Sequence, residues 1–164
     1  MDRELRKEIL RLLERNGRLS AAEIGIMTGC SEGEVQSIIE ELEKEQVICG
    51  YHTLINWNKE DEEMVTALVE LKVTPQGGDG YNKIAEQIYQ YPQVETLYLM
   101  SGAYDFLVEL KGKTIKEISM FVSENLASMD EVQSTATYFT LTKYKEQGVN
   151  LIKKKQDGRM VMTP

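Results

Sequence analysis

The sequence predicts an α+β protein built in two parts, and three observations support this prediction. Near the N-terminus, an amphipathic helical segment is followed closely by two Ser-x-x-Glu capping signals. A polar stretch at residues 56–63 then interrupts the apolar periodicity. Beyond it, segments with strand and helix periodicity follow in the order βαββαβ. We therefore expect domains at residues 1–55 and 64–145, a linker at residues 56–63 and a C-terminal tail at residues 146–164.

The first part begins with a helix at residues 2–16 that Gly17 ends. Its apolar positions fall at helical spacing, namely Leu5, Ile9, Leu12 and Leu13. Ser20 and Ser31 each stand three residues before a glutamate, which predicts two capping boxes and two further helices. The short turn between these helices contains Gly29, which can adopt the left-handed conformation. Two helices joined by so short a turn have the organisation of a helix-turn-helix.

A third helix is expected at residues 32–46, because its apolar residues again form one face. These residues are Val35, Ile38, Ile39 and Leu42. Residues 47–55 are rich in β-prone side chains, and the central Gly50 suits a turn. The sequence therefore predicts a two-stranded wing, which completes an N-terminal winged helix-turn-helix.

The second part predicts a ferredoxin-like βαββαβ domain, a four-stranded antiparallel sheet with two helices on one face. The expected strands are residues 65–73, 94–100, 105–110 and 132–142, and the expected helices are residues 81–91 and 115–126. Since the chain supplies no further helices for the other face of the sheet, we expect that face to pack against a second subunit. Residues 143–164 are expected to fray or to dock on a partner subunit.

Composition and charge narrow the classes of function. The 164-residue chain has a net charge of −8, which works against non-specific attraction to nucleic acid. Cys30 and Cys49 are expected to be reduced thiols, and the single histidine, His52, leaves almost nothing for a histidine-based metal site or catalytic triad. The charged N-terminus is unlike a signal peptide. We therefore expect a soluble cytoplasmic protein that is not an enzyme and has no cofactor or metal.

Three segments in this order resemble the Lrp/AsnC, or feast/famine, family of transcriptional regulators. They are VQSIIEELEKEQVI at residues 35–48, SGAYDFLVEL at residues 101–110 and VQSTATYFTLTKYK at residues 132–145. The resemblance covers the chain up to about Lys145. It implies an N-terminal domain that binds double-stranded DNA as a dimer and a C-terminal domain that assembles dimers into larger rings, often octamers. It also implies effectors, commonly amino acids, bound between dimers. A few similar proteins act on tetrapyrroles through histidines, a role for which this chain offers only His52.

The resemblance also implies an effector site. Its residues would be Gly102, Ala103, Tyr104 and Asp105 of the SGAYD loop, with Gln133, Ser134, Thr135 and Thr137 of the last strand opposite. Asp105 can pair with an ammonium group, Gly102 allows close approach of the backbone, and the hydroxyl and amide groups can donate to a carboxylate. The other interpretation is a β-turn in which Asp105 bonds nearby backbone amides. Both interpretations remain open.

The candidate DNA contacts lie at the start and on the exposed side of the third helix. They are Ser31, Glu32, Gln36, Ser37 and Glu40. Gln36 can bond adenine through two hydrogen bonds, and a serine can reach a phosphate or a base edge. Family members usually carry basic residues where this chain has Gln36, Ile38 and Glu41.

The third helix is acidic, and we expect the basic residues of the first helix and Arg18 to pair with it. Gln46 replaces the glycine that usually ends the helix, which leaves no easy left-handed cap. Two functions remain open. One is an oligomeric DNA-binding regulator modulated by an amino acid or similar effector. The alternative is a metabolite-sensing or protein-interaction module of the same ancestry that has lost most of its DNA affinity.

Overall fold

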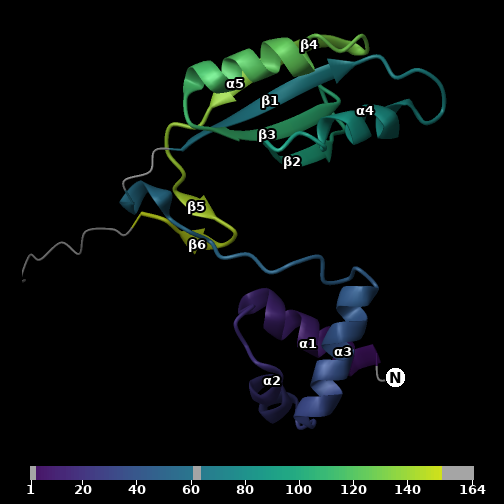
Figure 1. Ribbon diagram of the computed structural model, residues 1–164, viewed down its shortest axis with the longest axis vertical. Helices are drawn as coiled ribbons and strands as arrows, with labels where there is room; N and C mark the ends of the chain where they lie inside the picture. The colour runs from purple at the N-terminus through teal and green to yellow at the C-terminus, as the bar shows by residue number, and fades with distance from the viewer. Residues whose placement is uncertain (1–2, 61–63, 153–164) are drawn as a thin grey trace, which may run out of the picture. The chain divides into compact units, whose positions relative to one another are not determined.

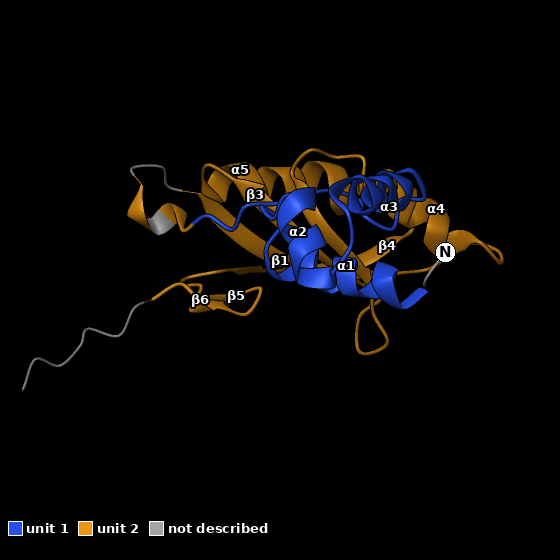
Figure 2. Ribbon diagram, turned by 90° about the horizontal axis from the view of Figure 1, so that it is seen from below, with its two compact units in different colours: residues 1–55 blue, residues 56–164 orange. Residues whose placement is uncertain are grey.

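The computed structural model describes residues 3–60 and 64–152. The chain divides into two compact units, residues 1–55 and residues 56–164 (Figure 2). Within the described ranges, no helix is long and apolar enough to cross a membrane.

Unit 1 consists of three helices around one small core (Figure 1). They are α1 (Arg3–Arg15), α2 (Ala21–Thr28) and α3 (Glu32–Lys44). The buried side chains come from all three helices and are Ile9, Leu13, Ile24, Val35, Ile38, Ile39 and Leu42. Burying one such side chain stabilises the fold by about 1.5–3 kcal/mol, so the apolar side of each helix is the side that faces the core.

The turn between α2 and α3 follows the expected chemistry. Ser20 and Glu23 form a complete capping box at the start of α2, and Gly29 ends that helix with φ +74°. At α3, the Ser31 side chain accepts a hydrogen bond from the Glu34 N–H at 3.3 Å. The Glu34 side chain makes no return bond to any described residue, so this second box is only half formed.

The expected two-stranded wing is not formed, because residues 47–55 contain no strand. Val47, Tyr51 and Ile55 keep 44–50% of their surface exposed, and Ile48 alone packs, partly buried, against the core of unit 1, so the segment has no continuous buried apolar face. A lone two-stranded hairpin without such a face is at best marginally stable. Hydrogen bonds still link the segment to α3: the N–H groups of Val47 and Ile48 bond the Leu42 carbonyl, and the Tyr51 hydroxyl donates to Glu43 Oε1 at 2.9 Å.

Unit 2 has the predicted βαββαβ order and an antiparallel sheet with strand order β2-β3-β1-β4 (Figure 1). Its strands are β1 (Val65–Val73), β2 (Val94–Leu99), β3 (Phe106–Gly112) and β4 (Val132–Phe139). Its helices are α4 (Gly80–Ile88) and α5 (Ile115–Phe121), and η2 (Val122–Leu126) continues α5 as a π-helix. Alternate residues of β1 and β3 pack against both helices in one core. The helices therefore cover one face of the sheet.

The other face of the sheet exposes apolar side chains. Leu68 of β1 lies opposite Tyr138 of β4, and Tyr98 of β2 lies opposite Leu107 of β3. Leu68, Tyr98 and Tyr138 are 37%, 55% and 54% exposed. Neither α4 nor α5, the α-helices of unit 2, covers this face.

The segment after β4 is more ordered than expected. β5 (Lys145–Glu146) and β6 (Val149–Asn150) form a small hairpin, so the expectation that residues 143–152 fray is wrong. The Lys143 ammonium contacts Glu109 Oε1 at 3.2 Å and Glu146 Oε1 at 2.9 Å. The Asn56 side chain also donates to the Leu151 carbonyl at 2.8 Å. The long-range bonds from Lys143 to Glu109 and from Asn56 to Leu151 hold the hairpin to the rest of unit 2. Lys153, Lys154 and Lys155 lie outside the described residues.

The expected linker is partly structured as well. η1 (Trp57–Lys59) forms one turn of 3-10 helix directly after Asn56.

Candidate functional site

The candidate DNA contacts all lie on the solvent side of α3. Ser31, Glu32, Gln36, Ser37 and Glu40 are exposed. They face outward because the interleaved apolar residues of α3 are buried in the core of unit 1. The packing of unit 1 therefore presents these five positions together on one accessible surface.

Several of these polar groups are already engaged in local hydrogen bonds. The Gln36 amide nitrogen donates to Glu40 Oε1 at 2.9 Å, and the Ser37 hydroxyl donates to the Gly33 carbonyl at 2.9 Å. To reach a base edge, Gln36 must exchange its bond to Glu40. The surface around it is acidic, since α3 carries five glutamates and one lysine.

One arginine of α1 pairs with α3 as expected. The Arg6 guanidinium contacts Glu41 at 2.8 Å and Glu45 at 2.5 Å. These hydrogen bonds and the two negative charges, Glu45 first, raise the pKa of Arg6. The expectation is wrong for the other basic residues of this segment: Lys7 pairs within α1, with Glu4 at 2.8 Å. Among the described residues, no ion pair is formed by Arg3, Arg11, Arg15 or Arg18.

The end of α3 differs from the expectation at Gln46. This residue adopts the left-handed conformation with φ +57°, although it is not a glycine. The turn is fixed by the N–H groups of Val47 and Ile48, which both bond the Leu42 carbonyl, at 2.9 and 3.1 Å. The left-handed cap is therefore kept at a cost in backbone strain.

In unit 2, Asp105 stands where the SGAYD loop enters β3. Its N–H donates to the Leu71 carbonyl at 2.9 Å. Its half-buried carboxylate accepts bonds from the Val73 N–H at 2.8 Å and from the Tyr81 hydroxyl at 3.2 Å. Partial burial and the Asp105 charge raise the pKa of Tyr81, which keeps its hydroxyl protonated as the donor. Asp105 thus bonds a backbone amide of the neighbouring strand rather than one of its own turn.

The last-strand candidates lie in three different places on the sheet. The Gln133 amide donates to the Thr74 hydroxyl at 2.5 Å, so it lies at the same end of β1 as Asp105. Ser134 pairs with Lys72 on the face of the sheet away from the helices. Thr135 and Thr137 pair with Leu71 and Val69 and share the helix-covered face. Since Val69 lies four residues before Val73 on β1, Thr137 is about 13 Å along the sheet from the Asp105 carboxylate.

The rest of the loop is open to solvent. Gly102 and Ala103 are exposed, and Tyr104 is half-buried.

The charge of Glu70 raises the pKa of Tyr138, and partial burial and nearby Tyr104 add to this effect.

No sequence pattern marked Tyr81 or Thr74 as parts of this site. Their bonds to Asp105 and Gln133 span 24 and 59 residues of chain. They are revealed only where the end of β1, α4, the start of β3 and β4 meet in the folded unit.

Comparisons with known proteins identify the family. A winged helix-turn-helix DNA-binding model matches residues 2–48, and a model of the Lrp/AsnC ligand binding domain matches residues 66–149. The chain belongs to the Lrp/AsnC family. It is 43% identical over 162 residues to the HTH-type transcriptional regulator YugG of Bacillus subtilis, covering 98% of each chain. It is 32% identical over 145 residues to an HTH-type transcriptional regulator of Pyrococcus horikoshii, covering 88% of this chain and 89% of the relative.

Solved structures of the family share the fold of this Lrp/AsnC protein. An AsnC family transcriptional regulator from Agrobacterium tumefaciens is 25% identical and matches 89% of this chain and 94% of its own, with a TM-score of 0.69. The regulator NMB0573 of Neisseria meningitidis, solved as a complex with L-Met, is 22% identical. It matches 92% of this chain and 97% of its own, with a TM-score of 0.70.

The predictions of the family and of the two-domain α+β fold class are confirmed, although residues 47–55 form no strands of a wing. The protein is a DNA-binding transcriptional regulator of the Lrp/AsnC type. The curated relatives compared above are likewise transcriptional regulators.

Proposed function

We propose that this regulator binds a small zwitterion, such as an amino acid, at the end of β1 and changes its DNA binding in response. The observation that supports this proposal most directly is the half-buried Asp105 carboxylate, which is held in place by Val73 and Tyr81. A carboxylate has about four lone-pair positions, so two bonds leave room for an ammonium group. Charge-assisted bonds of this kind are the stronger hydrogen bonds in proteins.

The surroundings of Asp105 suit the remaining parts of an amino acid. Gln133 and Thr74, at the same end of β1 as Asp105, supply donors for a carboxylate, whereas Thr137 lies too far along the sheet to reach the same small ligand. Gly102 and Ala103 let the loop backbone approach the ligand closely, and Tyr104 provides an aromatic wall. The ligand-binding family model and the L-Met complex of the neisserial relative support the same ligand class.

The proposed regulator works as a homodimer that assembles further, into a ring such as an octamer. The apolar sheet face with Leu68, Tyr98 and Tyr138 is the surface proposed to meet a second copy. Exposed apolar faces of this kind mark interaction sites in soluble proteins. The exposed loop at Gly102 and Ala103 would then be closed by a neighbouring dimer.

At the DNA, α3 is proposed to supply the base contacts. Gln36 is the side chain suited to adenine, and Ser31 and Ser37 reach phosphate or base edges. Glu32 and Glu40 border this surface, and Glu40 holds Gln36 until DNA replaces that bond.

A thermal-shift screen of the twenty amino acids against the full chain tests the effector proposal. A ligand that binds only the native state raises the Tm in a concentration-dependent way. The response should disappear in Asp105→Asn, which can still accept the Val73 N–H bond but lacks the charge. Glu86→Gln, an exposed carboxylate change in α4, should keep the response. A flat screen, or an equal response in Asp105→Asn, would overturn the proposal.

A further inference from the structure

The DNA-binding unit of this regulator is itself acidic. Residues 1–55 carry seven lysines and arginines against eleven aspartates and glutamates. Duplex DNA attracts proteins mainly through cations that neutralise phosphates and release counterions. The position of the few available cations therefore decides which surface can meet the phosphate backbone.

The available cations are concentrated on α1 and not on α3. Arg3, Lys7, Arg11 and Arg15 follow one another at intervals of four residues, which places them along one side of the helix. Lys7 is paired with Glu4, whereas Arg3, Arg11 and Arg15 form no ion pair with any described residue. Arg18 follows the helix. Its side chain is exposed and forms no ion pair with any described residue.

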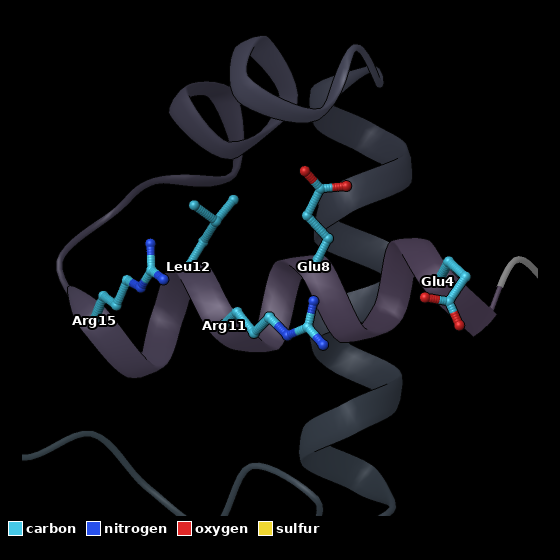
Figure 3. Close-up of a pocket in the computed structure, with 5 residues that line it drawn as sticks. All are labelled: Glu4, Glu8, Arg11, Leu12 and Arg15. Atoms are coloured by element: carbon cyan, nitrogen blue, oxygen red, sulfur yellow. The ribbon is translucent and has the colours of Figure 1, made fainter.

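The C-terminal half of α1 holds two arginines of this row, Arg11 and Arg15, together with Glu14. Figure 3 shows Arg11 and Arg15 projecting from this half of α1, beside Leu12 and Glu8, in the hollow that these residues line. Of the carboxylates in that hollow, Glu4 lies at the far end, next to Lys7. Along the helix, Glu8 lies three residues before Arg11, and Glu14 lies between the two arginines but does not line the hollow.

The exposed side of α3 has the opposite character. Arg6, the basic residue that α1 directs at α3, has its guanidinium bonded to Glu41 and Glu45. Lys44 is the single cation of α3, against five glutamates. A phosphate approaching α3 therefore meets net negative charge.

We propose that Arg11 and Arg15 of α1, with Arg18 after the helix, bind the phosphate backbone of duplex DNA, while α3 contributes neutral contacts to the bases. Guanidinium groups match phosphate oxygens through paired hydrogen bonds, and unpaired arginines lose no existing ion pair when they bind. This inference rests on the DNA-binding function of the regulator and identifies the surface that supplies its electrostatic affinity.

The salt dependence of binding tests the inference. Full-length protein and the double variant Arg11→Gln/Arg15→Gln are titrated with duplex DNA from upstream of the protein's own coding region, at several concentrations between about 50 and 200 mM salt. The variant should bind about tenfold to a hundredfold more weakly near 100 mM salt, and its slope of log K against log salt should be smaller by about 1 to 2. Circular dichroism should be unchanged, because both side chains are exposed.

Two further variants control for charge and for folding. Lys83→Gln/Lys116→Gln makes the same change in net charge at exposed positions of α4 and α5, and it should keep the slope. Glu8→Gln removes the carboxylate beside Arg11 and Arg15 and should tighten binding severalfold.

The outcomes separate this inference from the function beneath it. If the unaltered protein binds the duplex and Arg11→Gln/Arg15→Gln keeps its affinity and slope, the inference is overturned and DNA binding stands. An equal loss in the Lys83→Gln/Lys116→Gln variant also overturns it, because the effect would then be one of net charge. If the unaltered protein fails to bind the duplex at low salt, DNA binding itself fails, and the inference fails with it.

Discussion

Helices α1 and α3 have the same length and share one core, but they present opposite charges to solvent. Each has 13 residues and buries apolar side chains in the core of unit 1. α1 carries five basic and three acidic residues, whereas α3 carries one basic and five acidic residues. The shared apolar pattern places both helices in one core. The difference in charge underlies the proposal that α1 contacts phosphates and α3 contacts bases.

Arg6 links the two helices, and its guanidinium is therefore not available to bind a DNA phosphate. Its contacts with Glu41 and Glu45 neutralise part of the acidic side of α3. The row formed by Arg11 and Arg15 has no such partner among the described residues. One helix thus contains both a structural arginine and arginines free to bind an anion.

The largest expected effect comes from breaking the shared core. Leu42 is 1% exposed, so Leu42→Ala should lower the free energy of unfolding of unit 1 by about 2–5 kcal/mol, through lost burial and a residual cavity. Urea unfolding followed by circular dichroism measures this loss. Ile26→Ala is the matched control, because Ile26 is 85% exposed on α2 and its truncation should change stability by no more than about 0.5 kcal/mol. Equal losses in the two variants would contradict the assignment of Leu42 to the core.

A smaller loss is expected when the link between the helices is removed. Arg6→Gln leaves Glu41 and Glu45 unpaired and should lower the urea midpoint. The difference from the unaltered protein should shrink as salt is added, because salt screens charges near the surface. Arg3→Gln, which removes an arginine without an ion pair in the described structure, is the control. A salt-independent difference, or the same midpoint in both variants, would contradict an electrostatic link.

The smallest effect is expected at the end of α3, and it is a gain. Gln46→Gly should raise the free energy of unfolding by about 0.5–1 kcal/mol, because glycine adopts φ +57° without strain and this relief exceeds the added entropy of the unfolded chain. Gln46→Val should instead be destabilising, since β-branched residues strongly disfavour this region. Thermal unfolding of the two variants measures both changes. A loss of stability in Gln46→Gly would show that the Gln46 side chain itself stabilises the turn.

Much of the fold could be predicted because its signals are local. The Ser20 cap, the Gly29 turn and the apolar face of α3 depend on residues within a few positions of one another. β1 begins and ends where the sequence predicted, at Val65 and Val73. The wing at residues 47–55 was wrongly predicted, because β-prone side chains form a strand only where a neighbouring strand and a buried face exist.

The candidate sites could be predicted only in part. Asp105 and Gln133 were found from the family resemblance, but their partners Tyr81 and Thr74 come from segments far along the chain. The hairpin after β4 was missed for the same reason. Lys143 and Asn56 hold it through contacts with Glu109 and Leu151, and no periodicity records such pairs.

The sequence by itself determined the two-part plan, the three helices of unit 1, the βαββαβ order and the contrast in charge between α1 and α3. These follow from periodicity, capping and composition, which act over a few residues. The tertiary structure alone decided which arginine is consumed by an ion pair and which remain available. It also decided that Gln46 accepts a left-handed turn and that Asp105 meets Tyr81. Each of these depends on distances between segments that are remote in the chain, and those distances exist only after the cores have packed.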